Sequence, residues 1–262
     1  MKETGILFTP DNICAIREGR KTQTRRVMRP QPGSPWTYFY DEGGCLTSDW
    51  KLCCNNGIAY WSCTFHADAP GEPLLWKCPY GVPGDRLYIK EGIQRGAKNN
   101  PIPSLNHVWR YRLDNTQVLV DSYNETAMRV WVHHAEGDLR TAMFMPKWAA
   151  RTWLALTEVR VERVQDISEE DAAAEGCESL ESEREEYDWK ICPRCGGTRL
   201  YEYQSMAGAR PDTDCTECDT YKKRYRYLWD SINAKKHPWS SNPWVWVLTF
   251  KVLPEEGRAG HE

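Results

Sequence analysis

The chain has 262 residues and a formal net charge of −3; 40% of its residues are apolar, 27% are charged and 12% are aromatic. This composition is typical of a globular protein and excludes wholesale disorder. The slightly acidic balance also excludes a basic coat that binds any polyanion, while it permits a local basic site.

Apolar runs and cysteines indicate the compartment. The first residues contain only three consecutive apolar side chains, at 6–8, and no stretch approaches the roughly 20 apolar residues of a membrane span. We therefore expect a cytosolic protein without a membrane partner. Because the cytosol keeps thiols reduced, the eleven cysteines predict metal binding or burial rather than disulfides.

A short helix is predicted to begin at Pro10, with Ile13 and Ile16 on one face and Gly19 just past its end. The stretch GRKTQTRR, residues 19–26, begins at that glycine and contains four cations and two threonines. By charge alone, such a run is usually a solvated surface. Its position at a helix end and the hydroxyls among its cations favour a ligand site instead.

Lys21 and Thr24 within this stretch have the chemistry of a base and a nucleophile. Desolvation and neighbouring cations lower the pKa of a lysine, and the neutral amine can then accept the proton of a hydroxyl. Regular strand geometry would place the two side chains on opposite faces of a sheet. This interpretation therefore requires a bulge or turn between them.

The next part of the chain, residues 29–75, is rich in Pro, Gly and Trp without a sustained period, and we expect a loop-dominated elaboration there. Its scattered cysteines lack the spacing of a metal site; they are Cys45, Cys53, Cys54 and Cys63. The segment CPYGVPGDRLYIKE then predicts a turn at Pro83-Gly84 and a strand with Leu87 and Ile89 on one face. Short strands joined by polar loops are expected over residues 94–144, in HVWRYRL and AMRVWVHH.

The longest strand signal is TWLALTEVRVERVQDI, which follows residue 151. Its apolar positions change parity between Leu156 and Val159, so a bulge or bend is expected near Thr157-Glu158. Ser168 and the acidic residues after it predict a capped helix that ends near Gly176.

Two CxxC knuckles carry the strongest chemical signal of the chain. Cys192 and Cys195 lie in CPRCGG, and Cys215 and Cys218 lie in CTEC. Four thiolates in two such pairs can surround a zinc ion tetrahedrally, and four cysteine ligands leave no open position. The spacing therefore predicts a structural zinc site. The Arg-, Lys- and Tyr-rich segment around it is either a ribbon that contacts nucleic acid or a folded insertion with a solvated surface.

The last elements are a helix and a strand. YKKRYRYLWDSIN places five apolar or aromatic residues on one helical face: Tyr221, Tyr225, Leu228, Trp229 and Ile232. NPWVWVLTFKVL aligns five on one side of a strand: Trp244, Trp246, Leu248, Phe250 and Val252. Such rings can stack bases, but this many same-parity apolar positions favour a core. Several strands with few helices predict an α+β fold built on a small barrel or curled sheet.

Four blocks of the sequence together resemble the ASCH domain family, and in particular its longer members from phages and prophages. The blocks are ICAIREGRKTQTRRV, PGDRLYIKE, VRVERVQDISEEDAAAEG and NPWVWVLTFKVL, and they cover about half of the chain in this order. The resemblance implies a PUA-like small β-barrel with flanking helices. It also implies the cytosol of a bacterium or of a phage-infected host, and a cleft that binds RNA, another nucleic acid or a modified nucleoside.

The resemblance further implies a catalytic set. Small family members that hydrolyse the acetyl amide of N4-acetylcytidine use a Lys, a Thr and a Glu, which match Lys21, Thr24 and Glu175. In those roles the threonine attacks the acyl carbon, the lysine takes its proton and the glutamate either orients these groups or relays a proton. The competitors for the glutamate are Glu169, Glu170 and Asp171. The arginines would hold a phosphate or stabilise an oxyanion; they are Arg20, Arg25 and Arg26.

The predicted domains follow from these blocks. The ASCH or PUA-like domain takes residues 1–187 and 225–253, with loop-rich insertions at 31–75 and 94–144; a zinc-ribbon-like insertion with four cysteine ligands takes 188–224, and a flexible tail takes 254–262. Because fold does not fix function, three alternatives stay beside the amidohydrolase. They are a non-catalytic reader of nucleic acid or modified bases, a ribonuclease, and a phage structural or host-interaction protein.

Overall fold

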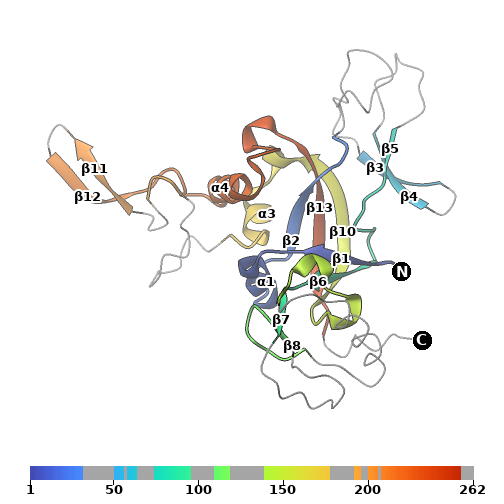
Figure 1. The fold of residues 1–262 in the computed structure, drawn as a ribbon. Helices are drawn as coiled ribbons and strands as arrows, with labels where there is room; N and C mark the ends of the chain where they lie inside the picture. Colours follow the sequence, from blue (N-terminus) through green and yellow to red (C-terminus); the bar gives the residue numbers. More distant parts are fainter. Residues whose placement is uncertain are drawn as a thin grey trace, which may run out of the picture. The chain divides into compact units, whose positions relative to one another are not determined.

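A computed structural model describes residues 1–31, 50–55, 58–63, 74–95, 109–118, 139–177, 192–195, 200–205 and 208–254 (Figure 1). The chain divides into two compact units. The first contains Met1–Cys14, Pro79–Leu156 and Lys251–Glu262, and the second contains Ala15–Cys78 and Thr157–Phe250. Within the described residues, no helix combines the length and the hydrophobicity needed to cross a bilayer. The predicted domain boundaries stay a prediction.

The described part of the first unit contains the start of helix α1 (Pro10–Arg17), short strands and two 3₁₀ turns. The strands and turns are β1 (Glu3–Leu7), β6 (Arg86–Lys90), β7 (Ile93–Arg95), β8 (Trp109–Tyr111), β9 (Leu139–Arg140), η1 (Ala142–Phe144) and η2 (Lys147–Ala149). Strand β1 pairs in parallel with β6, and β6 pairs antiparallel with the start of β10 (Trp153–Arg163). Strand β7 pairs with β8 and β9. The strand predicted in CPYGVPGDRLYIKE is confirmed as β6, and the face that carries Leu87 and Ile89 is fully buried.

The second unit contains most of the remaining elements. They are β2 (Gln23–Val27), β3 (Trp50–Asn55), β4 (Ile58–Cys63), β5 (Leu74–Trp76), η3 (Val164–Asp166), α3 (Glu169–Ala174), β11 (Leu200–Ser205), β12 (Gly208–Asp214), α4 (Tyr221–Asn233), η4 (Trp239–Ser241) and most of β13 (Trp244–Val252). Strand β13 lies between β10 and β2 in the sheet order, and Thr24 of β2 is opposite Leu248. The α+β class is therefore confirmed as a mostly stranded fold with few helices. The PUA-like barrel stays a prediction.

Several local predictions are confirmed. Helix α1 (Pro10–Arg17) buries Ile13 and Ile16, and Gly19 after it has a φ of +76°. Strand β10 changes its buried parity where expected, because Thr157 and Glu158 are both exposed between buried Leu156 and Val159. The Ser168 side chain accepts a hydrogen bond from the Asp171 amide at the start of α3.

Two apolar faces differ from prediction. In β13, Val245 and Val247 are as buried as the predicted face, because α4 and α3 cover their side in one core cluster, whereas Val252 at the strand end is 44% exposed. In α4, Ile232 is 56% exposed since it lies in the last turn, while the charged Arg224 is buried. Packing on both sides of a strand erases the alternation that a one-sided pattern assumes.

The region predicted to be loop-dominated contains more regular structure than expected. Strands β3, β4 and β5 form an antiparallel three-stranded sheet, with Cys53 opposite Tyr60 and Cys63 opposite Leu74. The sequence between β3 and β4 includes Asn-Gly at 56–57, which is a strong hairpin signal. Cys45, the AMRVWVHH segment and residues 255–262 of the predicted tail lie outside the described residues.

Candidate functional site

The backbone brings the end of helix α1 and the end of helix α3 together in the second unit. The amide of Lys21 donates to the carbonyl of Ala15, and Lys21 forms an isolated antiparallel bridge with Glu175. Gly176 follows with a φ of +86°, and a Cβ atom at this position would lie 2.9 Å from the Cβ of Lys21. A glycine is therefore required here both by the dihedral angle and by the close approach of Lys21.

Lys21 and Glu175 form a buried ion pair. The ammonium Nζ of Lys21 donates to Oε2 of Glu175 and to the backbone carbonyl of Glu175, each at 2.6 Å. Lys21 is 2% exposed and Glu175 is 3% exposed. Burial lowers the pKa of Lys21 from its ordinary value of 10.5, although the charge and hydrogen bond of Glu175 oppose this effect. A lysine in such surroundings gives up its proton more readily than a lysine in water.

Arg25 binds the other oxygen of the same glutamate. Its Nη1 lies 3.2 Å from Oε1 of Glu175, and its guanidinium also pairs with Glu162 and Asp171. Burial alone would lower the pKa of Arg25, but Glu175, Tyr225 and Glu162 raise it above its usual range. Arg25 was predicted to hold substrate; the structure places its fully buried side chain among three carboxylates.

The four acidic candidates of the helix after residue 168 have different partners. Glu175 contacts Lys21 and Arg25, whereas Asp171 accepts hydrogen bonds from Arg25 and Arg160. Glu169 instead accepts the amide of Tyr221 at the start of α4. Glu170 is exposed. Geometry therefore favours Glu175 as the partner of Lys21.

The other residues of GRKTQTRR are distributed around this pair. Thr24 is 4% exposed on β2, and the reach of its Oγ1 toward Lys21 stays a prediction. Arg20 is exposed and its Nε donates to Glu18 at 2.7 Å. Arg26 is half-buried, and its positive charge contributes to the lowering of the pKa of Lys21. The stretch thus contains a buried titratable cation, a buried hydroxyl and an exposed arginine.

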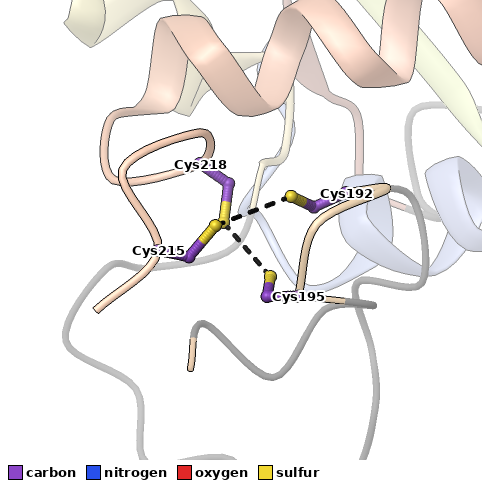
Figure 2. A group of neighbouring side chains, drawn as sticks. All are labelled: Cys192, Cys195, Cys215 and Cys218. Atoms are coloured by element: carbon purple, nitrogen blue, oxygen red, sulfur yellow. Dashed lines mark hydrogen bonds between the residues drawn. The ribbon is translucent and has the colours of Figure 1, made fainter. Parts of the chain in front are cut away.

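The four predicted zinc ligands converge in the same unit. Figure 2 shows the sulfur atoms of Cys192, Cys195, Cys215 and Cys218 turned toward one another, and all four lie within 4.8 Å. The sulfur of Cys192 is 3.8 Å from that of Cys215, and the sulfur of Cys195 is 3.6 Å from that of Cys218. Each residue is at most 8% exposed. This donor set could hold a metal ion such as zinc.

Strands β11 and β12 lie between the two knuckles in sequence and pair with each other in antiparallel register, with Leu200 opposite Asp214. The hairpin therefore returns the chain from the first knuckle to the second. Thr220, two positions after Cys218, caps helix α4 by accepting a hydrogen bond from the amide of Lys223. The second knuckle is thus joined to α4 by a few residues of chain.

Sequence reasoning missed a second buried carboxylate, which lies in the first unit. Glu91 is 2% exposed, and its oxygens accept Nε and Nη2 of Arg151 at 2.9 Å and 2.7 Å. The same guanidinium lies 3.8 Å from the ring centre of Tyr111 and pairs with Asp114. Glu91 also borders a cavity of about 390 Å³. The sequence gives only one indication of this site, which is the position of Glu91 at the end of the alternating strand RLYIKE. Its partner Arg151 could not be predicted because it is distant in sequence.

No family model, no curated protein and no solved structure matches this chain. The site must therefore be interpreted from its own geometry. That geometry offers a buried Lys-Glu pair, a buried threonine on the adjoining strand, and a closed four-cysteine site.

Proposed function

We propose that this chain is an ASCH-like protein with a PUA-like barrel that binds RNA or a modified nucleoside and hydrolyses the acetyl amide of N4-acetylcytidine. One observation carries the proposal. The Lys21 ammonium lies 2.6 Å from the Glu175 carboxylate in surroundings that exclude water. The resemblance gave catalytic roles to these two residues, which are far apart in sequence.

The lowered pKa of Lys21 supplies the base. Burial disfavours the ammonium, so a neutral amine is available at lower pH than for a lysine in water. Glu175 holds the amine through Oε2, while Arg25 holds the glutamate through Oε1. Arg25 therefore acts in this proposal as a positioning residue. We expect kcat/KM to rise with pH and to level off below pH 10.5, the ordinary pKa of lysine.

The reaction proceeds in two balanced steps. Lys21 accepts the Thr24 hydroxyl proton as Oγ1 bonds to the acetyl carbon; the C–N bond then breaks and Lys21 returns the proton to the leaving exocyclic amine. Water next attacks the threonyl ester, with Lys21 again accepting a proton, and acetate leaves as Thr24 recovers its hydroxyl. Arg26 stabilises the negative charge on the carbonyl oxygen, and Arg20 contacts phosphate when the nucleoside is part of RNA.

The four cysteines hold a structural zinc ion in this proposal. Four sulfur ligands leave no position for a substrate or a reactive water. Zinc binding would also supply part of the folding free energy of the segment between the knuckles, because β11 and β12 pair only with each other and an isolated two-stranded hairpin is marginally stable.

A protein that binds nucleic acid or modified bases without catalysis is the second candidate, and the burial of Lys21 and Thr24 favours it. Lys21 and Thr24 are both under 5% exposed, so an acylated base reaches them only if the site opens. In a reader, the buried network is structural and exposed cations such as Arg20 bind phosphate.

Acetate release separates the two functions. The zinc-loaded protein is incubated with N4-acetylcytidine and with labelled RNA, and the assays are repeated with Lys21→Ala and Thr24→Ala. Thr22→Ala is the matched control, because Thr22 is the exposed threonine of the same stretch. We expect acetate release to be lost in the first two variants and kept in the control.

Other outcomes assign the alternatives. Salt-sensitive RNA binding without acetate release, kept in Thr24→Ala and weakened in Arg20→Ala, would establish the reader. Cleavage of the labelled RNA would establish a ribonuclease. Neither binding nor turnover would favour a structural or host-interaction role.

A further inference from the structure

Arg224 connects the four-cysteine site to helix α4. Its side chain is 1% exposed, and its Nε donates to the backbone carbonyl of Cys218 at 2.8 Å. A buried guanidinium is costly unless its donors are satisfied. This bond therefore fixes the second knuckle to the first turns of α4.

The next residue, Tyr225, connects α4 to the Lys21–Glu175 pair. Tyr225 is 3% exposed, and its ring centre lies 5.8 Å from the guanidinium carbon of Arg25. Arg25 in turn donates to Glu175, which accepts the ammonium of Lys21. The rings of Trp229 and Trp239 also lie near the Tyr225 ring, with centre-to-centre distances of 6.3 Å and 6.1 Å. Rotation or translation of α4 would therefore move the group that covers Arg25.

A second connection joins the starts of the two helices. The carboxylate of Glu169, at the first residue of α3, accepts the amide of Tyr221 at 2.8 Å. Glu175 is the C-cap of that same helix. Helix α4 is therefore connected to Glu175 in two ways, through Arg25 and through α3. The second knuckle, α4, α3 and Lys21 thus form a continuous set of contacts within the second unit.

We propose that Arg224 and Tyr225 are positioning residues through which metal occupancy of the four-cysteine site controls the Lys21–Glu175 pair. A bound metal fixes Cys218, Arg224 transmits that position to α4, and Tyr225 then keeps water away from Arg25 and Glu175. Loss of the metal releases the start of α4 and hydrates the pair. The effect on turnover rests on the proposed function, whereas the effect on Lys21 itself does not.

Hydration of the Lys21–Glu175 pair should shift the pKa of Lys21 upward. Burial is the leading cause of the lowered pKa of Lys21, and the charged or titratable groups that act on it are Glu175, Arg26 and Cys177. None of these groups belongs to α4. Entry of water therefore weakens the leading cause, and the pKa of Lys21 rises toward 10.5, its ordinary value. Less neutral amine is then available at neutral pH.

The test is a pH titration of Lys21 by carbon NMR of its ε carbon in the zinc-loaded protein, with the signal assigned by its loss in Lys21→Arg. Tyr225→Leu removes the ring over Arg25, while Tyr225→Phe keeps it and serves as the control. Arg224→Met and Arg224→Lys form the equivalent pair at the knuckle. Chelation removes the metal, and Cys78→Ser is the control for loss of a buried cysteine that is not a ligand.

We expect Tyr225→Leu, Arg224→Met and chelation each to raise the pKa of Lys21, and Tyr225→Phe and Cys78→Ser to leave it unchanged. We also expect kcat for acetate release at pH 7 to fall about tenfold in Tyr225→Leu with KM unchanged. Chelation of the Tyr225→Leu protein should cause no further rise, because the same step is already broken. A general loss of structure would instead give additive effects.

Two results overturn the proposal: a Lys21 titration that is identical with and without zinc, or a chelation effect that is undiminished in Tyr225→Leu. If the titrations change as expected but no variant or wild-type protein releases acetate, the connection stands and the hydrolase function fails. Circular dichroism of each variant confirms that its fold is retained during the titration.

Discussion

Each unit of this protein contains a buried glutamate paired with a cation, but the two cations differ. In the first unit, Arg151 places two nitrogens on the two oxygens of Glu91 and stacks on Tyr111. In the second, Glu175 receives Lys21 on one oxygen and Arg25 on the other. An arginine keeps its proton at any ordinary pH, whereas a desolvated lysine can release it. Of these two buried pairs, only the one that contains Lys21 therefore has a cation that could serve as a base.

Replacing the titratable cation should have the largest effect. In Lys21→Arg the charge beside Glu175 is kept but no base is available, so the proposed hydrolase function predicts that acetate release falls about a thousandfold. Thermal unfolding and the rate are measured on the same preparations. Arg151→Lys is the matched exchange at the other pair and should leave the rate per folded molecule unchanged. A Lys21→Arg protein with wild-type turnover would remove Lys21 from the chemistry.

Breaking the other pair should cost stability instead of turnover. Arg151→Met leaves the buried carboxylate of Glu91 without its bidentate partner, and we expect a loss of about 3–5 kcal/mol in the free energy of unfolding. Urea denaturation measures it. Arg110→Met, at a half-buried arginine whose Nη1 donates to the carbonyl of Asn115, is the control and should cost less than about 1 kcal/mol. An equal loss in both variants would mean that water compensates Glu91 when its arginine is removed.

The two pairs also show what the sequence could predict. Lys21 and Glu175 were matched through the resemblance, and the structure brings them into contact. The four-cysteine cluster followed from spacing alone, because both knuckles are local patterns and their sulfur atoms converge. Arg25 was predicted to hold a substrate, and this stays a prediction; strand position did not show that three carboxylates from later segments surround it. Its burial depends on contacts between distant parts of the chain.

The same limit explains the errors in the fold. The parity change in β10 and the cap at Ser168 are local, and both were predicted from their own residues. The burial of Val245 and Val247 was not, since it depends on which elements cover the second face of β13. Glu91 gave a weak signal because its arginine lies sixty positions later in the chain. A periodic sequence pattern predicts the local structure of one segment. It does not predict an ion pair between two segments that are far apart in the chain.

The pH dependence of stability should distinguish the two cations. The pKa of Lys21 is lower in the folded protein than its ordinary value of 10.5. Between these two values the unfolded chain binds a proton that the folded chain does not, so stability increases as pH rises through this window and is lost as pH falls. In urea unfolding from pH 7 to 10, the free energy of unfolding of wild type should increase relative to that of Lys21→Met. The difference between wild type and Arg151→Met should stay constant, and a constant difference for Lys21→Met as well would show that its pKa is not lowered.

The smallest effect is expected at the outer partner of Arg151. Burial alone would raise the pKa of Asp114, but hydrogen bonds from Thr116 and Arg151 lower it to about 2 from an ordinary 3.8. The stability that this carboxylate contributes is therefore present above pH 3.8 and is lost as pH falls through about 2. Because its side chain is 39% exposed, solvent screens the interaction, and Asp114→Asn should cost under about 1 kcal/mol at pH 7. Urea unfolding at pH 7 and below pH 4 measures the stability difference between wild type and Asp114→Asn. This difference should shrink in acid, and at pH 7 the difference for Arg151→Met should be several times larger. If Asp114→Asn lowered the free energy of unfolding as much as Arg151→Met, the stabilising partner of Arg151 would be the exposed Asp114 and not the buried Glu91.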